Sequence, residues 1–263
     1  MTMTMRVMRR ALLGWLAAGL LALAPAGLSA AEIRVMISGG FFEPFRQMVP
    51  QFEQSSGHRV VIIQGASMGN APDAIPVRLG RGEAADVLIL AAPALDQLIA
   101  AGHGAPGSRV DLVRSLIGMS VRSGAPRPDI STEEGFIRAL REARSIAYSA
   151  SASGTYFAQT LIPRLGLADE ILPKARRILS ERVGTVVARG DAELGLQQVS
   201  ELLPIPGIDF IGVLPPSLQQ ETIFSAGIAA RAQEVQAARA LIAFMAGPEA
   251  VDAIRRAGLE PIR

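Results

Sequence analysis

The fold is decided by the stretch Ile33-Arg-Val-Met-Ile-Ser-Gly-Gly40, in which a short apolar run ends in three small residues. Apolar runs of this length are typical of strands that are buried on both faces of a sheet. Residues 41–55 then continue as a helix-like segment. The stretch therefore predicts a strand, a small-residue loop and a helix in succession.

The same order recurs further along the chain. The later strands are predicted at residues 59–64, 87–90 and 145–148, and the helices that follow them begin near residues 73, 93 and 156. Strands that alternate with helices indicate parallel pairing, because a parallel connection needs a long crossover. We therefore predict an α/β protein whose sheets are mainly parallel and flanked by helices.

Two turn-rich stretches, residues 101–109 and 123–129, lie on either side of the apolar run 116–121. This break in the middle of the chain suits a crossover from one lobe to a second. A return near residues 222–229 makes the first lobe discontinuous. The predicted lobes are residues 32–114 with 222–263 for lobe 1, and residues 115–221 for lobe 2.

Residues 1–31 have the order of a secretory signal peptide. A basic start with three arginines precedes the apolar run 11–24, and small residues then offer a cleavage point near Ala30 or Ala31. The apolar run is too short for a transmembrane helix, which needs about 20 residues. We therefore expect an exported, periplasmic protein.

Removal of this segment takes away three arginines and no acid, so the formal charge changes from +2 to −1. A nucleic-acid-binding protein presents a basic face, whereas the arginines here are scattered among acids. The chain has no cysteine and only two histidines, which leaves no cluster of metal ligands. We expect a monomer with no metal, no cofactor and no nucleic-acid partner.

Three loops that follow predicted strands combine hydroxyl groups with small residues. In parallel sheets, ligands collect where strands end and helices begin, and the N–H groups of a helix N-terminus bind anions there. The loops are residues 38–40, 65–70 and 149–155. Within them, the predicted ligand-binding residues are Ser38, Gly39, Gly40, Ser67, Met68, Ser151, Ser153, Gly154 and Thr155.

The second loop, Gly65-Ala-Ser-Met-Gly69, also matches the nucleophile elbow of serine hydrolases. A hydrolase needs a histidine base, which in such enzymes follows the acid along the chain. His58 precedes the elbow, and His103 lies in a glycine-rich turn. We therefore favour anion binding over hydrolysis at this loop.

At these loops the sequence resembles the periplasmic molybdate-binding family of ABC-transporter substrate-binding proteins. The segments that carry the resemblance are residues 32–40, 65–69, 78–89, 154–156 and 191–195. The resemblance implies a type II periplasmic binding protein, whose two lobes close about a hinge over a small anion, and a possible ABC-transporter permease as partner. In that family, serine hydroxyls, backbone N–H groups and a tyrosine hold the oxyanion. Gln198 stands where the tyrosine falls, and the first loop is Ser-Gly-Gly instead of an alanine–serine run.

The chain also resembles a divergent branch of the fold that includes periplasmic aconitate isomerase. The matching segments are residues 36–40, 65–69, 74–79, 148–154 and 196–204. This resemblance implies a polycarboxylate ligand and, for an enzyme, a cofactor-independent allylic proton shift. Gln197 or Gln198 can join the serines in holding the ligand, and Arg78 or Arg182 can pair with a carboxylate. The candidate catalytic bases are Tyr148, Tyr156, Glu43 and Glu201.

Two hypotheses therefore stand side by side. The first is a solute-binding protein for a small anion, with a polycarboxylate (such as a tricarboxylate) favoured over a molybdate-type oxyanion. The second is an isomerase that interconverts cis- and trans-aconitate in the same cleft. The residues do not choose between the four candidate bases.

Overall fold

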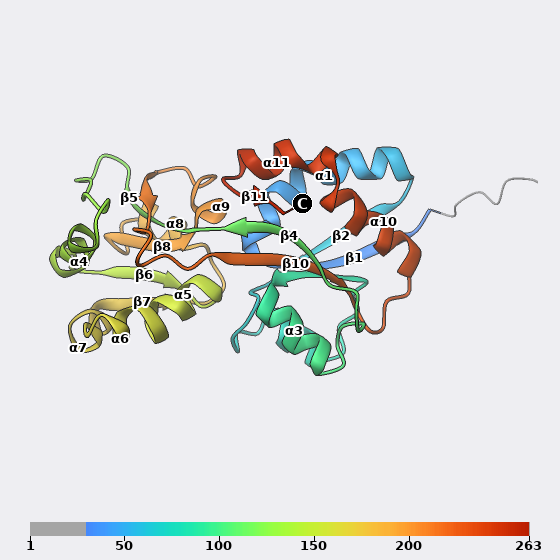
Figure 1. Ribbon diagram of the computed structural model, residues 1–263, viewed down its shortest axis with the longest axis horizontal. Helices are drawn as coiled ribbons and strands as arrows, with labels where there is room; N and C mark the ends of the chain where they lie inside the picture. The colour runs from blue at the N-terminus through green and yellow to red at the C-terminus, as the bar shows by residue number, and fades with distance from the viewer. Residues whose placement is uncertain (1–29, 263) are drawn as a thin grey trace, which may run out of the picture.

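The computed structural model describes residues 30–262, and most of the predicted signal peptide lies outside this range. The described chain forms two lobes that lie side by side, each built on one sheet (Figure 1). None of the helices within residues 30–262 has the length and apolar character that a membrane span requires. The fold class predicted from the strand–loop–helix order is confirmed.

The sheet of lobe 1 has the strand order β11-β4-β10-β3-β1-β2. Its strands are β1 (Glu32–Ile37), β2 (Arg59–Gln64), β3 (Val87–Ala91), β4 (Val110–Ser115), β10 (Thr222–Ile228) and β11 (Glu260–Pro261). One face is covered by α1 (Gly39–Ser56), α10 (Val235–Ala246) and α11 (Val251–Arg256), and the other by α2 (Ile75–Gly80) and α3 (Ala92–Ala100). Val35 packs toward the first face and Met36 toward the second, because side chains alternate along a strand.

The sheet of lobe 2 has the strand order β7-β6-β8-β5-β9. Its strands are β5 (Ile117–Arg122), β6 (Ile146–Ser149), β7 (Ala175–Ile178), β8 (Leu194–Gln198) and β9 (Ile208–Val213). Its helices are α4 (Glu133–Glu142), α5 (Ala152–Tyr156), α6 (Ile162–Arg164), α7 (Ala168–Ile171), α8 (Val183–Ala188) and α9 (Val199–Leu202). A π-helical turn at Phe157–Leu161 joins α5 to α6.

Each sheet is mixed, where the sequence predicted mainly parallel strands. The parallel pairs are β1 with β2 and β3, and β6 with β7 and β8. The antiparallel pairs involve β4, β5, β9, β10 and β11, most of which lead into or out of a lobe crossing. Strands β4, β7, β8, β9 and β11 were not predicted. Of these, the edge strand β7 carries two arginines in place of an apolar run.

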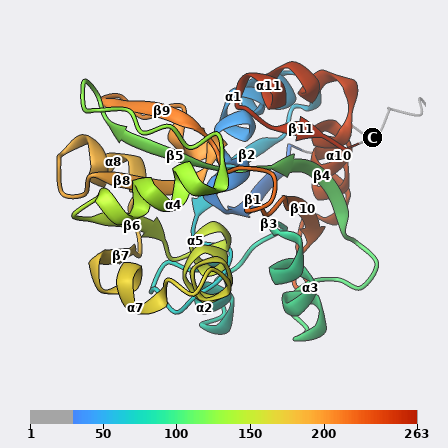
Figure 2. The ribbon, with the colours of Figure 1, turned by 60° about the vertical axis from the view of Figure 1, so that its left-hand side comes forward.

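The chain passes between the sheets twice, from β4 to β5 and from β9 to β10, and the first crossing is visible in Figure 2. Gln198 bridges the crossings, because its Oε1 accepts from Ser115 Oγ at 2.7 Å and its Nε2 donates to Thr222 Oγ1 at 3.0 Å. Gln219 adds two bonds of 2.9 Å to the backbone of Ile117. These two glutamines define the hinge, and we propose lobe boundaries at residues 114/115 and 221/222.

Candidate functional site

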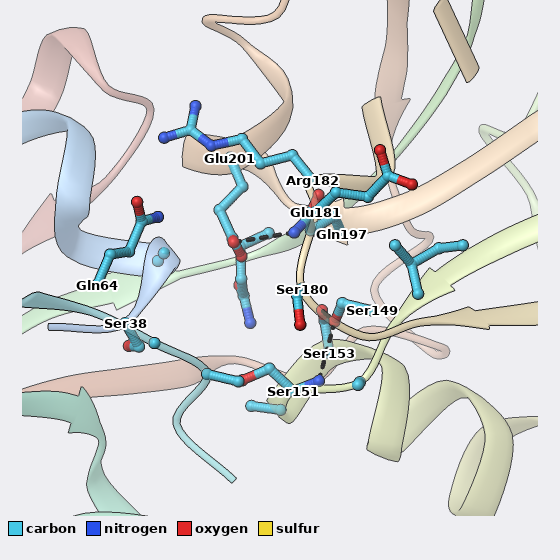
Figure 3. A pocket seen from close by; sticks show the side chains of 18 of the residues that line it. Ser38, Gln64, Ser149, Ser151, Ser153, Ser180, Glu181, Arg182, Gln197 and Glu201 are labelled. Atoms are coloured by element: carbon cyan, nitrogen blue, oxygen red, sulfur yellow. Dashed lines mark hydrogen bonds between the residues drawn. The ribbon is translucent and has the colours of Figure 1, made fainter. Parts of the chain in front are cut away.

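A cavity of about 270 Å³ lies between the lobes, where β1, β2, β6 and β8 end (Figure 3). This is the edge that the strand–loop–helix order predicts for ligand binding. Its wall contains Ser38, Gly39, Gly40, Gln64, Gly65, Ala66, Asp73, Ser149, Ala150, Ser151, Ala152, Ser153, Ile178, Leu179, Ser180, Glu181, Arg182, Gln197, Gln198, Glu201 and Phe224.

The lobe 1 wall includes the N-terminus of α1, a helix of 18 residues. Ser38 is its N-cap, yet the Ser38 hydroxyl does not bond back to the helix. This hydroxyl is buried and has no hydrogen-bond partner within the described part of the chain. No acidic residue in the first turn neutralises the helix N-terminus. Free N–H groups and a free hydroxyl therefore face the cavity together, which suits an anion.

The lobe 2 wall contains the serine loop that follows β6. Ser149 Oγ and Ser153 Oγ lie 3.0 Å apart and share a hydrogen bond. Ser151 Oγ accepts from the backbone N–H of Ser67 across the cleft at 3.2 Å. Two further bonds cross the cleft, from Ser180 Oγ to Asp73 Oδ1 at 3.0 Å and from Ser200 Oγ to the carbonyl of Gly40 at 2.7 Å. The lobes are thus held together around the cavity.

Glu201 in α9 is the carboxyl group at the centre of the cavity (Figure 3). Its Oε1 accepts a hydrogen bond of 2.9 Å from Gln197 Nε2. The amide of Gln197 can face only this way, because its Oε1 accepts from the backbone N–H of Val183 at 2.9 Å. Glu201 Oε1 therefore already accepts one hydrogen bond, whereas Oε2 has no hydrogen-bond partner among residues 30–262.

Desolvation raises the pKa of Glu201 from 4.5 to about 7, although the charge of Arg182 and the hydrogen bond from Gln197 both act to lower it. A carboxyl with this pKa is present in both protonation states at neutral pH. It can therefore accept and return a proton under the same conditions.

The close approach of α1 to Glu201 depends on Gly39. A Cβ atom at this position would overlap Oε1 of Glu201. The Ser-Gly-Gly form of the first loop, which departs from the molybdate-binding pattern, is thus the form that admits a carboxyl group against the helix N-terminus.

Residues 33–260 match the family model of the bacterial extracellular solute-binding proteins. The chain belongs to this family. The chain is 45% identical over 251 residues to an aconitate isomerase from a Pseudomonas species, an alignment that covers 94% of this chain and 96% of that protein. It is 25% identical over 253 residues to the molybdate-binding protein ModA of Azotobacter vinelandii, with 92% and 94% of the two chains covered.

The solved structure of the periplasmic molybdate-binding protein of Azotobacter vinelandii matches this solute-binding protein with a TM-score of 0.70 and 24% identity. The match covers 88% of this chain and 100% of that chain. The predicted resemblance and the type II periplasmic binding protein fold are confirmed. The family is one of extracellular proteins, which agrees with the predicted periplasmic location.

Several predicted ligand-binding residues line the cavity of this solute-binding protein, and others do not. Those in its wall are Ser38, Gly39, Gly40, Ser151, Ser153, Gln197 and Gln198. Ser67 is fully buried, and its hydroxyl accepts from the backbone N–H of Ala91 at 3.0 Å. Met68 packs against the apolar cluster on the α2–α3 face of lobe 1. Gly154 and Thr155 lie in α5, outside the cavity wall.

Of the four candidate bases, only Glu201 lines the cavity. The Tyr156 hydroxyl donates to the carbonyl of Leu218 at 2.9 Å, and the ring of Tyr148 packs on Phe157. Glu43 is engaged by Arg46 and Gln47, whose hydrogen bonds hold its pKa below the usual value even though burial raises it.

The structure does not support the other roles considered from the sequence, namely Arg78 as a ligand-binding residue and a serine hydrolase with a histidine base. Arg78 is paired with Glu83, so it is not free for a ligand carboxylate. His58 accepts from the backbone N–H of Ala31 and has no contact with the elbow serine. Within residues 30–262, no group of three or more His, Cys, Asp or Glu side chains could hold a metal ion.

Sequence reasoning named Arg182 as a possible carboxylate partner, but it missed the adjoining segment 179–181 of the wall. It follows β7, which carries two arginines and was not predicted as a strand. The segment could have been predicted from its position before the apolar residues that begin α8, because it then follows the strand–loop–helix order of the other loops. Gln64 and Asp73, which flank the second loop, were also missed.

Proposed function

We propose that this protein interconverts cis- and trans-aconitate, with Glu201 as the proton-carrying residue. The observation that carries the proposal is the Glu201 carboxyl, with its pKa of about 7, in a cavity whose wall also contains serines, Arg182 and a helix N-terminus. The 45% identity to an aconitate isomerase over nearly the whole chain supports the same assignment.

The reaction moves one proton and one double bond. Ionised Glu201 takes a proton from the methylene carbon through Oε2, and the electron pair left behind spreads over the three-carbon allyl unit and its carboxylates. The proton then returns to the opposite carbon of that unit. The former methylene carbon becomes part of the new double bond, so atoms and electrons balance and nothing is oxidised or reduced.

The donors around Glu201 fit the charge that develops in this step. The N-terminus of α1 and the unpartnered hydroxyl of Ser38 can bind the carboxylate into which the negative charge spreads. Preorganised donors of this kind in an enclosed site stabilise a transition state more than they do in water. Gln197 keeps the carboxyl of Glu201 in one orientation throughout the cycle.

A polycarboxylate suits the cavity better than a tetrahedral oxyanion. The volume of about 270 Å³ is close to the lower end of small-molecule sites, which is about 300 Å³. An ionised Glu201 repels any anion, but a carboxyl group that accepts a proton near pH 7 is useful only for a ligand that must lose one, such as a polycarboxylate with a methylene group. We therefore assign the site to a tricarboxylate.

A second candidate function is binding without turnover, in which the protein delivers a polycarboxylate to an ABC-transporter permease. The three hydrogen bonds that join the lobes across the cleft favour retention of a ligand. Under both functions the signal peptide is removed near Ala30 or Ala31, and the mature protein acts as a monomer.

The deciding experiment is proton NMR of trans-aconitate with purified mature protein in D₂O. We expect cis-aconitate at many turnovers with deuterium entering the methylene group, and a rate at least about 10²-fold lower for Glu201→Gln. Glu170→Gln, an exposed change in lobe 2, serves as the matched control. Because the ionised carboxyl is the base, kcat/KM should rise tenfold per pH unit below pH ~7 and level off above it.

Two results would overturn the assignment. Full activity in Glu201→Gln would move the base elsewhere. Tight binding of aconitate by the wild-type protein without any conversion would leave only the transport function.

A further inference from the structure

Arg182 is the only basic side chain in the wall of the cavity, within the part of the chain that the structure describes. It lies in the cavity wall of lobe 2 at the N-cap of α8 (Figure 3). It reaches over to lobe 1, where its guanidinium carbon is 5.5 Å from the centre of the Phe42 ring. The ring face attracts the cation and fixes the side chain across the cleft.

Apart from the Phe42 ring, the guanidinium of Arg182 has no side-chain partner among the described residues. Among residues 30–262 it forms neither a side-chain hydrogen bond nor a salt bridge, whereas several other arginines pair with acids on the surface. An arginine carries five N–H donors in a flat fork that matches a carboxylate. The partly buried guanidinium of Arg182 therefore has N–H donors available for an anionic ligand in the cavity.

The acids near Arg182 do not supply that partner. Glu43 lies close enough to feel its charge but is bound by Arg46 and Gln47. Glu201 also feels the charge of Arg182, yet its Oε1 is bound by Gln197 and no salt bridge forms. Glu181, the next acid in the wall, is paired with Arg189.

We propose, building on the isomerase assignment, that Arg182 binds one carboxylate of the substrate while the α1 N-terminus binds another, so that the site selects polycarboxylates over monocarboxylates. The two anchors belong to different lobes. A ligand with carboxylates at both ends of a short carbon chain therefore closes the cleft and holds its reactive carbon near Glu201.

Arg182 has a second effect on the site through its charge. Because its charge favours the ionised form of Glu201, its removal raises the pKa of that carboxyl further. The other groups that face Glu201 are Gln197, which is neutral, and the α1 backbone at Gly39. A merely structural arginine would leave the pH dependence of the rate unchanged when replaced by a well-folded variant.

The test uses propane-1,2,3-tricarboxylate, a saturated probe that binds but cannot isomerise, in calorimetry with the mature protein. We expect Arg182→Gln to weaken its binding about 10- to 100-fold and Arg182→Lys to fall in between, since a hydrogen-bonded charge pair contributes about 1.5–3 kcal/mol. Arg176→Gln, an exposed change on β7, should bind as the wild-type protein does. In Arg182→Gln the lower limb of the pH–rate profile should move to higher pH.

Phe42→Leu separates charge from packing, because it removes the ring and keeps the arginine. The proposal would be overturned if both variants lost equal probe affinity with no change in the pH profile. Unchanged probe affinity in Arg182→Gln, or no probe binding by the wild type, would also overturn it. Since the calorimetry needs no turnover, loss of probe binding in Arg182→Gln supports the anchor even if aconitate is not converted. Failure of the isomerase assignment is thus seen separately.

Discussion

Gln197 and Gln198 are neighbours at the end of β8 and are both almost fully buried, yet they serve two different regions. Gln197 connects the N-terminus of α8 to Glu201 in the cavity, and Gln198 connects Ser115 to Thr222 in the hinge. Successive side chains of a strand point to opposite faces, so the two amides bond to different partners although both residues line the cavity. Identical side chains at equal burial therefore differ in role only through their partners.

The largest effect that tests this contrast is expected from Gln197→Leu. Loss of the amide frees the Glu201 carboxyl from its fixed orientation, and a misplacement of about 1 Å at a reacting group costs about 10²-fold in rate. We expect kcat for aconitate to fall by that amount while the protein stays folded. Gln198→Leu is the comparison variant, since Gln198 also lines the cavity but bonds to the hinge, and an equal fall of kcat in both variants would break the contrast.

Gln198→Leu should act on stability more than on the rate. It leaves the buried hydroxyls of Ser115 and Thr222 without their partner, which costs about 1–3 kcal/mol for an unsatisfied buried group. Calorimetry should therefore show a lower Tm, with probe affinity reduced because the hinge is looser. An unchanged Tm with strongly reduced kcat would instead place Gln198 among the ligand-binding residues.

The smallest effects are expected from Ser67→Ala and Ser38→Ala. These two buried serines, like the two glutamines, differ in whether they stabilise the fold or face the ligand. Ser67→Ala removes the acceptor of the Ala91 N–H, so stability should fall by about 1 kcal/mol with probe affinity unchanged. Ser38→Ala breaks no hydrogen bond within the described chain, so stability should stay while probe affinity falls about 2- to 10-fold. Denaturant titration and calorimetry on both variants measure the two effects, and the reverse pattern would exchange their roles.

The order of strands and helices was predictable because it depends on local patterns. The apolar run at residues 33–37 and the small residues after it indicate a strand and a helix start without knowledge of the rest of the chain. The edge of the sheet that holds the cavity followed from this order alone. Strand β7 was not predictable in this way, since Ala-Arg-Arg-Ile has no apolar run.

The roles of individual side chains depended on distant partners and could not be predicted. Ser38 and Ser67 occupy equivalent loops, but Ser67 is engaged by Ala91, 24 residues away, and Ser38 is not. Glu201 could not be singled out among the four candidate bases, because its raised pKa arises from desolvation in the folded protein, where Gly39 of the other lobe lies against its carboxyl. The family resemblance suggested the ligand class but not which carboxyl group faces it.

The partly buried, desolvated carboxyl of Glu201 also has a consequence for the free energy of unfolding. The folded protein binds the Glu201 proton with a pKa of about 7, above the unfolded value of 4.5. The resulting stabilisation is complete below pH ~4.5 and is lost as the pH rises through about 7, with an upper limit of about 3 kcal/mol. The same carboxyl that we propose as the proton carrier therefore lowers the stability of the fold when it is ionised, and the Tm should fall as the pH rises through about 7.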